Sequence, residues 1–167
     1  MTGLDKNSII RNRCVGKPCF KFVTKEYTEV RNLKIFGNGG TFGVGATVGE
    51  AIVYENAPHF NIVNCSIRYN GAGIKCIGGV WCIGLTDVEI EHNLARGVES
   101  ISNSGIASEQ TGNALNIKGG SISLNGGDGV RWKASSVCVT GATIESNKGR
   151  GFVVDNTGLT NSAFDVS

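Results

Sequence analysis

The stretch IVNCSIRYNGAGI, residues 62–74, decides the fold, because its pattern of residue types returns along the chain. An apolar residue is followed by a second three positions on and a third two positions later, then by an Asn and a Gly–apolar pair. Further full copies begin at Leu85, Ile117 and Val139, a looser one at Val30 and a partial one at Leu159, at intervals of 20 to 32 residues. Repeats of this length built from strand-like pieces are typical of a solenoid.

Each copy predicts strands joined by turns. Apolar and polar residues alternate, as in Cys65-Ser66-Ile67, and a period of two indicates β-strands. The Asn-to-Gly section of each copy is typical of turns, because Asn tolerates a left-handed backbone and Gly adopts it freely. Helical periodicity and helix caps are missing from the sequence. The sequence therefore predicts an all-β fold, a parallel β-helix solenoid of about six coils.

Stacking the copies predicts which side chains lie above one another. One inward column is an unbroken isoleucine stack, and a second holds small or branched residues. Asn side chains are expected to form an Asn turn ladder, each amide bonding to the next coil and satisfying buried turn backbone. Loops are expected to protrude at Gly39–Asn56 and Ile101–Asn113, where the period lengthens. The three columns are Ile35, Ile67, Ile90, Ile122 and Ile144; Leu33, Cys65, Val88, Gly120 and Ala142; and Asn38, Asn70, Asn93, Asn125 and Asn147.

The composition fits one β-helix domain over residues 1–167, with an opening segment or first coil at 1–27 and regular coils at 28–167. Gly is frequent (25), Pro is rare (2) and charge is modest (18%), which excludes collagen and disorder. Because no apolar run reaches 18 residues and no secretion signal occurs, no membrane partner is expected. A net charge of +2 without a basic stripe argues against a nucleic-acid partner.

The six cysteines do not have the spacing of a zinc site, so no metal site is expected. Several stand where the repeat demands an apolar residue, and Cys is a small, commonly buried hydrophobe. We therefore expect reduced core residues of a protein that folds in a cytosol. The alternative, a disulfide or redox role, stays open.

The Asn70–Ile74 segment and the Asn column resemble the right-handed parallel β-helix superfamily of pectate lyases and phage tailspikes, over residues 28–167. The opening residues 2–4, 17–22 and 30–39 resemble the first coils of phage tailspike and neck-appendage proteins. That resemblance implies a homotrimer on a virion tail or appendage, folded in the host cytoplasm, that binds or cleaves a cell-surface polysaccharide. The Asp clusters and Arg motif of a calcium-dependent pectate lyase are missing, so no cofactor is expected.

The chain stops inside a sixth coil, at Ser167, without a visible cap. An open β-helix end is an unpaired strand edge, which natural proteins cover. The sequence therefore predicts a fragment of a longer protein, or a chain whose end is covered by partners.

Three glutamates are the candidate catalytic residues, because polysaccharide cleavage by a β-helix needs outward carboxylates and a hydrolase uses a pair. Glu89 and Glu91 point outward from one strand, and Glu145 lies in the column of Glu91 two coils on. The alternative is that they are ordinary surface charges: Glu91 is expected beside Arg68, and Glu89 two coils from Lys34.

Four other residues are candidates for substrate binding. Lys75 and Arg131 are outward cations that suit an acidic glycan, or members of a charge ladder with Glu99. Tyr69 and Trp81 offer flat rings for a sugar face, or pack under a loop or at a trimer interface.

The remaining candidates carry less chemistry. Trp132 alternates inward and is expected in the core, and His59, after Pro58, is expected in a loop. His92 is a candidate acid/base partner of Glu91, or simply exposed. There is no G-x-S-x-G, no cysteine with a paired histidine and no P-loop.

Three functions stay open. The first is a β-helix segment of a phage tailspike or appendage that binds a host polysaccharide and, as a depolymerase, degrades it. The second is a non-enzymatic structural or adhesive trimeric spacer. The third is a fragment of a bacterial polysaccharide lyase or epimerase. All three are compatible with the fold, because one fold hosts many functions.

Overall fold

The structure, a computed structural model, describes residues 8–24, 26–37, 49–101, 112–133, 136–155 and 163–166, with only the backbone at 112, 113 and 163–166. The predictions made for Asn38, Leu159 and Ser162 lie outside the described residues.

Short strands make up the described fold. Their bounds are β1 Ile9–Arg11, β2 Phe20–Val23, β3 Tyr27–Arg31, β4 Lys34–Phe36, β5 Ile52–Glu55, β6 His59–Val63, β7 Ser66–Arg68, β8 Ile74–Ile77, β9 Val80–Thr86, β10 Glu89–Glu91, β11 Val98–Ile101, β12 Gly112–Lys118, β13 Ser121–Ser123, β14 Val130–Trp132, β15 Ser136–Thr140, β16 Thr143–Glu145, β17 Phe152–Val154 and β18 Ala163–Val166.

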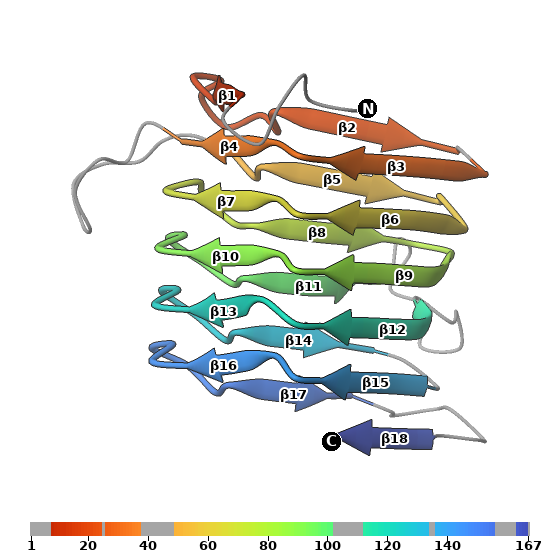
Figure 1. Ribbon diagram of the computed structural model, residues 1–167. Helices are drawn as coiled ribbons and strands as arrows, with labels where there is room; N and C mark the ends of the chain where they lie inside the picture. Colours follow the sequence, from red (N-terminus) through yellow and green to blue (C-terminus); the bar gives the residue numbers. More distant parts are fainter. Residues whose placement is uncertain are drawn as a thin grey trace.

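Every third strand joins the same parallel sheet (Figure 1). The first sheet has the order β1-β4-β7-β10-β13-β16, the second β2-β5-β8-β11-β14-β17, and the third β3-β6-β9-β12-β15-β18. Each strand pairs only with its equivalents one coil before and one coil after. This arrangement confirms the predicted all-β, parallel β-helix of about six coils. Strands β1 and β2, in the segment expected to open the chain, already pair within their sheets.

The chain turns from one sheet to the next through single left-handed residues. Asn32, Asn64 and Asp87 stand between the third and first sheets with φ of 55°, 49° and 51°. Non-glycine residues in this region are uncommon and are most often Asn or Asp. Asn32, Asn64 and Asp87 therefore suit these corners, although the described asparagines of the repeat are not themselves left-handed. Equivalent left-handed residues follow the first sheet at Tyr69, His92, Leu124 and Ser146.

The predicted isoleucine stack forms the side of the core under the first sheet. Strand register places Ile35, Ile67, Ile90, Ile122 and Ile144 in one column, as predicted, and adds Ile10 at its start. The four from Ile35 to Ile122 are at most 1% exposed. A column of branched apolar side chains packs well across parallel strands and is removed from water on all sides.

Large aromatic residues fill the side of the core between the second and third sheets. Tyr54 stacks on Phe60 with ring centroids 3.5 Å apart and on Phe22 at 4.9 Å. Trp132 is fully buried, which confirms its predicted place in the core. Cys65 and Cys76 are buried among these residues, as expected for cysteines in the core. The same expectation is wrong for Cys14 and Cys82, which are exposed.

The Asn turn ladder is confirmed at Asn70, Asn93 and Asn125, which are fully buried, and at the half-buried Asn147. The sequence reading missed Asn12, a buried member in the first coil whose Nδ2 donates to Asn70 Oδ1 at 3.3 Å. The repeat could not reveal it, because Asn12 stands directly after its strand, one position earlier than the other ladder residues.

The predicted loop boundaries are partly wrong. Residues 52–55, expected in the first loop, form β5, and residues 112 and 113, expected in the second, begin β12. The reason is visible in the sequence: Ile52, Val53 and Tyr54 are an apolar run whose side chains are buried, with Ile52 registered against Ile74. Burial of these residues favours a strand over a loop.

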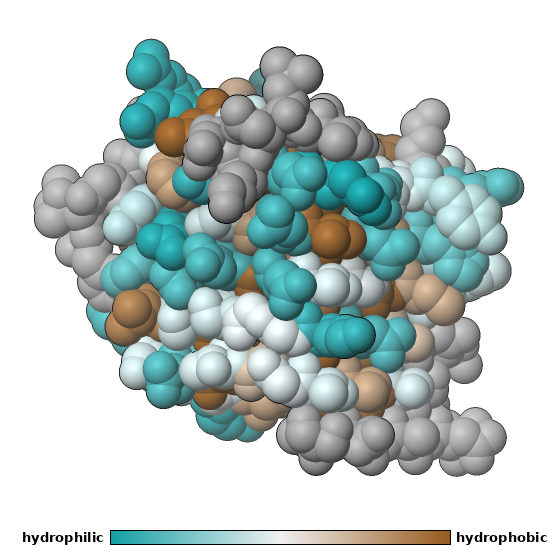
Figure 2. Space-filling model, viewed as in Figure 1, coloured by the Kyte–Doolittle hydropathy of each residue, from teal (hydrophilic) through white to brown (hydrophobic). Residues whose placement is uncertain are grey.

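The outer surface in the view of Figure 2 is mostly hydrophilic to neutral, with apolar residues scattered over it rather than gathered in one broad patch. In the part of the chain that the structure describes, no helix is long and apolar enough to cross a membrane.

Candidate functional site

The three candidate catalytic glutamates lie on the outer face of the first sheet. Register places Glu91 directly beside Arg68 and Ser123, and Ser123 beside Glu145. The predicted column is therefore confirmed, with Glu145 two coils from Glu91. The structure brings Glu89 and Glu91 together on β10 and leaves Glu145 apart from them.

One guanidinium bridges the two glutamates of β10. Arg68 Nη2 lies 2.8 Å from Glu89 Oε2 and 3.1 Å from Glu91 Oε2, and Ser121 Oγ donates to Glu91 Oε1 at 2.8 Å. Partly exposed ion pairs of this kind stabilise a fold by about 0–1 kcal/mol. The contacts agree with the surface-charge alternative, and a catalytic role for Glu89, Glu91 and Glu145 stays a prediction.

The two candidate cations lie on the second sheet and differ in their partners. Lys75 Nζ is 3.0 Å from Glu50 Oε1 and 3.9 Å from Glu99 Oε1, and Glu99 also pairs with Arg96. Arg131 is registered beside Glu99 and makes no ion pair with it. The Lys75 contacts fit the charge-ladder alternative, while Arg131 makes no ion pair among the residues that the structure describes.

The two candidate aromatic residues are also separated. Tyr69 stacks on His92, with centroids 5.3 Å apart and planes at 15°, and meets Phe36 edge-on at 6.3 Å. These contacts fit the packing alternative. Trp81 is 52% exposed at the start of β9, where the chain enters the third sheet.

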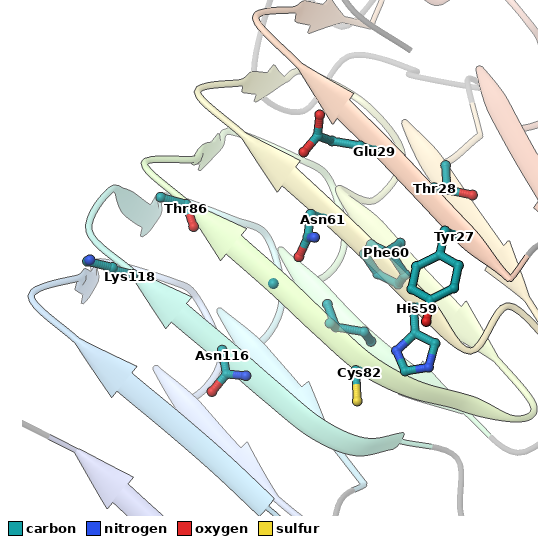
Figure 3. A pocket seen from close by; sticks show the side chains of 12 residues that line it. Tyr27, Thr28, Glu29, His59, Phe60, Asn61, Cys82, Thr86, Asn116 and Lys118 are labelled. Atoms are coloured by element: carbon teal, nitrogen blue, oxygen red, sulfur yellow. The ribbon is translucent and has the colours of Figure 1, made fainter.

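A concave surface that the sequence reading did not identify crosses the outer face of the third sheet (Figure 3). This third-sheet groove has a volume of about 700 Å³ and runs over β3, β6, β9 and β12, perpendicular to the strands. None of the seven candidate site residues from the sequence lines it. The lining residues are Tyr27, Thr28, Glu29, His59, Phe60, Asn61, Cys82, Ile83, Gly84, Thr86, Asn116 and Lys118.

The floor of the groove is lowest at Gly84. Register places Glu29, Asn61, Gly84 and Asn116 in one outward column, so the glycine presents no side chain of its own between two amides. A Cβ on Gly84 would lie 2.3 Å from Asn61 Oδ1, so the Asn61 side chain rests over the glycine. Asn61 and Asn116 are exposed and have no hydrogen-bond partner among the described residues.

One wall of the groove is a second outward column, Tyr27, His59 and Cys82. The Tyr27 and His59 rings stack with centroids 5.0 Å apart and planes at 9°, and Tyr27 is 81% exposed. His59 is the first residue of β6, so the expectation of a loop was wrong. The same register puts Cys82 directly beside His59. This Cys–His pair matches no local sequence motif.

Charge enters the groove at its ends. Arg31 Nη2 donates to Glu29 Oε2 at 2.8 Å, and this hydrogen bond is the main reason that the pKa of Glu29 is lowered. Lys118 lies at the opposite end, on β12. The charges therefore flank the aromatic wall and the amide floor rather than line them.

The signal for this groove was present in the sequence but fell outside the repeat. The repeat was read from the apolar residue next to the end of each third-sheet strand, whereas the groove residues stand one to three positions before it or directly after it. Those positions vary from coil to coil, and only the strand register brings them into columns.

Among the described residues, no group of three or more His, Cys, Asp and Glu side chains is placed to hold a metal ion. Comparison of the chain with protein-family models, with curated proteins and with solved structures gives no match.

Proposed function

We propose that this protein is a carbohydrate-binding β-helix of the phage tailspike or appendage kind, and that the third-sheet groove holds an extended cell-surface polysaccharide. The observation that supports this most directly is the floor at Gly84, where the exposed Asn61 and Asn116 amides have no side-chain partner among the described residues and the exposed Tyr27 ring forms a wall. A flat ring covers the apolar face of a pyranose, and amides donate to and accept from hydroxyl groups.

The direction of the groove supports a chain-like ligand. It crosses four coils, and neighbouring parallel strands are about 4.8 Å apart, a spacing similar to the length of one sugar unit. A glycan lying along the coil axis then meets a different pair of outward groups at each coil, Tyr27 and Glu29 first and His59 and Asn61 next. The proposal includes homotrimeric assembly and a place on a virion tail, which rest on the resemblance of the opening coils.

Cleavage of the bound glycan is a separate proposal. The Glu89–Glu91 pair lies on the first sheet, outside the groove, so binding and cleavage would use different faces of the coil. A non-enzymatic spacer can be distinguished from a glycan-binding protein and from a glycan-cleaving enzyme, because a spacer binds no glycan.

Calorimetric titration with a panel of bacterial surface polysaccharides and their oligosaccharides tests the proposal. We expect Tyr27→Ala to weaken binding about five- to tenfold, the loss of roughly one aromatic contact. Gly84→Ala should also weaken it, because the added methyl displaces the Asn61 amide while the fold is kept. Ser136→Ala, on the same sheet outside the groove, and Glu145→Gln, on the first sheet, are the controls.

Two results would overturn the proposal. One is that no polysaccharide of the panel binds to the parent chain. The other is that Tyr27→Ala and Gly84→Ala bind a glycan as tightly as Ser136→Ala does, which would place the glycan elsewhere on the molecule.

A further inference from the structure

We propose that Cys82 and His59 form a thiol–imidazole pair that hydrolyses a carboxylic ester, such as an O-acyl group on a sugar, in the third-sheet groove. The proposal rests on the proposed function only for the source of the ester. The reaction itself can be tested without a glycan.

The placement of the two residues comes from the strand register. His59 on β6 and Cys82 on β9 are partners in adjacent parallel strands, which lie about 4.8 Å apart. Both side chains line the groove, and Cys82 is exposed (Figure 3). A nucleophile and a base are therefore neighbours on the concave surface where a ligand would lie.

The backbone at Cys82 departs from regular strand geometry. Trp81 N–H and Cys82 N–H both donate to the carbonyl oxygen of Pro58, at 3.0 and 2.7 Å. Trp81 and Cys82 are consecutive residues of β9, yet both are exposed, so the in–out alternation is broken here. Irregular strand positions of this kind re-aim a side chain and are common next to active sites. The irregularity turns both Trp81 and the thiol outward at the rim of the groove.

His59 is suited to act as the base. Only a thiolate attacks a carbonyl carbon efficiently, and an ordinary thiol is mostly protonated at neutral pH, so it needs a neighbouring proton acceptor. Imidazole is the usual acceptor near pH 7. Tyr27 stacks on the His59 ring from the next strand, which fixes the plane of that ring, while Cys82 lies on the strand at the other side.

A donor for the developing oxyanion stands on the floor. Asn61 follows His59 by two residues on β6 and its amide has no partner among the described residues. Side-chain amides serve as oxyanion donors in acyl transfer. Asn61 therefore completes the set of nucleophile, base and donor on two neighbouring strands.

The reaction is balanced without any co-reactant except water. His59 takes the thiol proton, the sulfur attacks the ester carbonyl carbon, and the C–O bond to the alcohol breaks as the alkoxide takes the proton from the imidazolium. Water then attacks the thioester, with His59 accepting its proton, and the thiolate leaves and is reprotonated. The products are the carboxylic acid and the free alcohol.

The chain contains a matched control for Cys82. Cys138 points outward from β15 of the same sheet, two coils on, and its register partners are Asn116 and Asp165 rather than a histidine. Its Sγ lies 3.8 Å from Thr140 Oγ1. A comparison of the two thiols separates the effect of the imidazole from that of the sheet face.

The test uses the full chain and p-nitrophenyl acetate as the probe. Nitrophenolate release is followed by absorbance and the acetylated cysteine is identified by peptide mass spectrometry. We expect a burst in which Cys82 is acetylated before Cys138, and we expect His59→Ala to slow that burst about a hundredfold, the lower end of the range usual for a general base. The burst in His59→Ala should rise with pH more steeply than in the parent, because the thiol then has no neighbouring base.

Cys82→Ala should abolish the burst and Cys138→Ala should leave it unchanged. His59→Gln is a second variant in case His59→Ala perturbs β6, and circular dichroism reports the fold of each. The proposal would be overturned if Cys82 were acetylated no faster than Cys138. It would also be overturned if Cys82 were acetylated in both His59 variants at the parent's rate and with the parent's pH profile. Glycan titration of the parent chain keeps the two hypotheses apart, because a parent chain that binds glycan but shows no Cys82 burst refutes only the esterase, and one that shows the burst but binds no glycan refutes only the glycan site.

Discussion

Asn93 Oδ1 accepts a hydrogen bond from the backbone N–H of Asn70 at 3.0 Å, one coil away. The same bond recurs from Asn93 N–H to Asn125 Oδ1 and from Asn125 N–H to Asn147 Oδ1, both at 3.1 Å. The amide nitrogen of Asn93 donates in addition to the carbonyl of Ile67 at 3.3 Å. These groups are buried, where an unpaired backbone donor or acceptor is costly. Each asparagine therefore satisfies the turn of the coil before it, and the ladder joins the coils.

We predict that Asn93→Ala lowers the free energy of unfolding by about 2–4 kcal/mol. The substitution leaves Asn70 N–H and the Ile67 carbonyl without their partner, at about 1–3 kcal/mol for each buried group. Urea denaturation followed by circular dichroism measures the loss. Asn116→Ala, at an exposed strand position, should stay within about 0.5 kcal/mol of the parent. Equal stabilities for the two variants would mean that the ladder contributes little.

Gly120 and Gly141 form a second matched pair, since both have a left-handed backbone, with φ of 77° and 62°. A Cβ on Gly120 would lie 2.3 Å from the carbonyl oxygen of Val88, whereas one on Gly141 meets nothing within 4 Å. Gly141→Ala should therefore cost only the left-handed strain, about 1–2 kcal/mol. Gly120→Ala should cost clearly more, because backbone of the neighbouring coil must move. Thermal unfolding of the two variants measures the difference, and a smaller loss for Gly120→Ala would contradict the contact.

Tyr54 gives a prediction of the opposite sign. Its ring is fully buried between Phe22 and Phe60, and its hydroxyl has no hydrogen-bond partner among the described residues. Burial is also the main reason that the pKa of Tyr54 is raised. Because the hydroxyl loses water without gaining a partner, Tyr54→Phe should stabilise the fold, by about 1 kcal/mol or more. Urea denaturation checks it, and a loss of stability would indicate that the hydroxyl is bonded in solution.

The sequence predicted what repeats. Ile90, Asn93 and Arg68 each fall at a fixed place in the copies, and alternation with a period of two was enough to assign their faces and neighbours. Trp132 could be placed in the core by the same alternation. The physical reason is that stacked coils impose the same burial on equivalent positions.

What does not repeat could not be predicted in the same way. Gly84 looks like an ordinary turn or strand glycine until register sets it between Asn61 and Asn116. Cys82 and His59 are 23 positions apart, at the start of two strands where the copies share no residue type. The groove is formed by positions whose residue types differ between coils. Such positions can be placed beside one another only when the strand pairing is known.

Glu50 should make stability depend on pH. Burial raises the pKa of its carboxyl, but hydrogen bonds from its own backbone and from Lys75, together with the Lys75 charge, outweigh burial and lower the pKa overall. A carboxyl with a lower pKa in the folded state adds stability above its unfolded pKa of about 4.3, and this is lost as pH falls through the folded value. Glu50→Gln should therefore be less stable than the parent near about pH 7, and the difference should shrink as the pH falls below about 4.3.

The expected difference at neutral pH is about 0.2–1 kcal/mol, as for other partly exposed ion pairs. Urea denaturation at a series of pH values measures it, with Lys75→Met and the double variant completing a mutant cycle. Lys75→Met removes the cation that offsets the burial of Glu50. The free energy of unfolding of the parent should therefore exceed that of Lys75→Met by the largest amount at neutral pH. In the Glu50→Gln background the same Lys75 substitution should show a smaller pH dependence, which comes from the longer Lys75–Glu99 pair. A Glu50→Gln difference that grows toward acid would contradict the sign of the shift and the role given to Lys75.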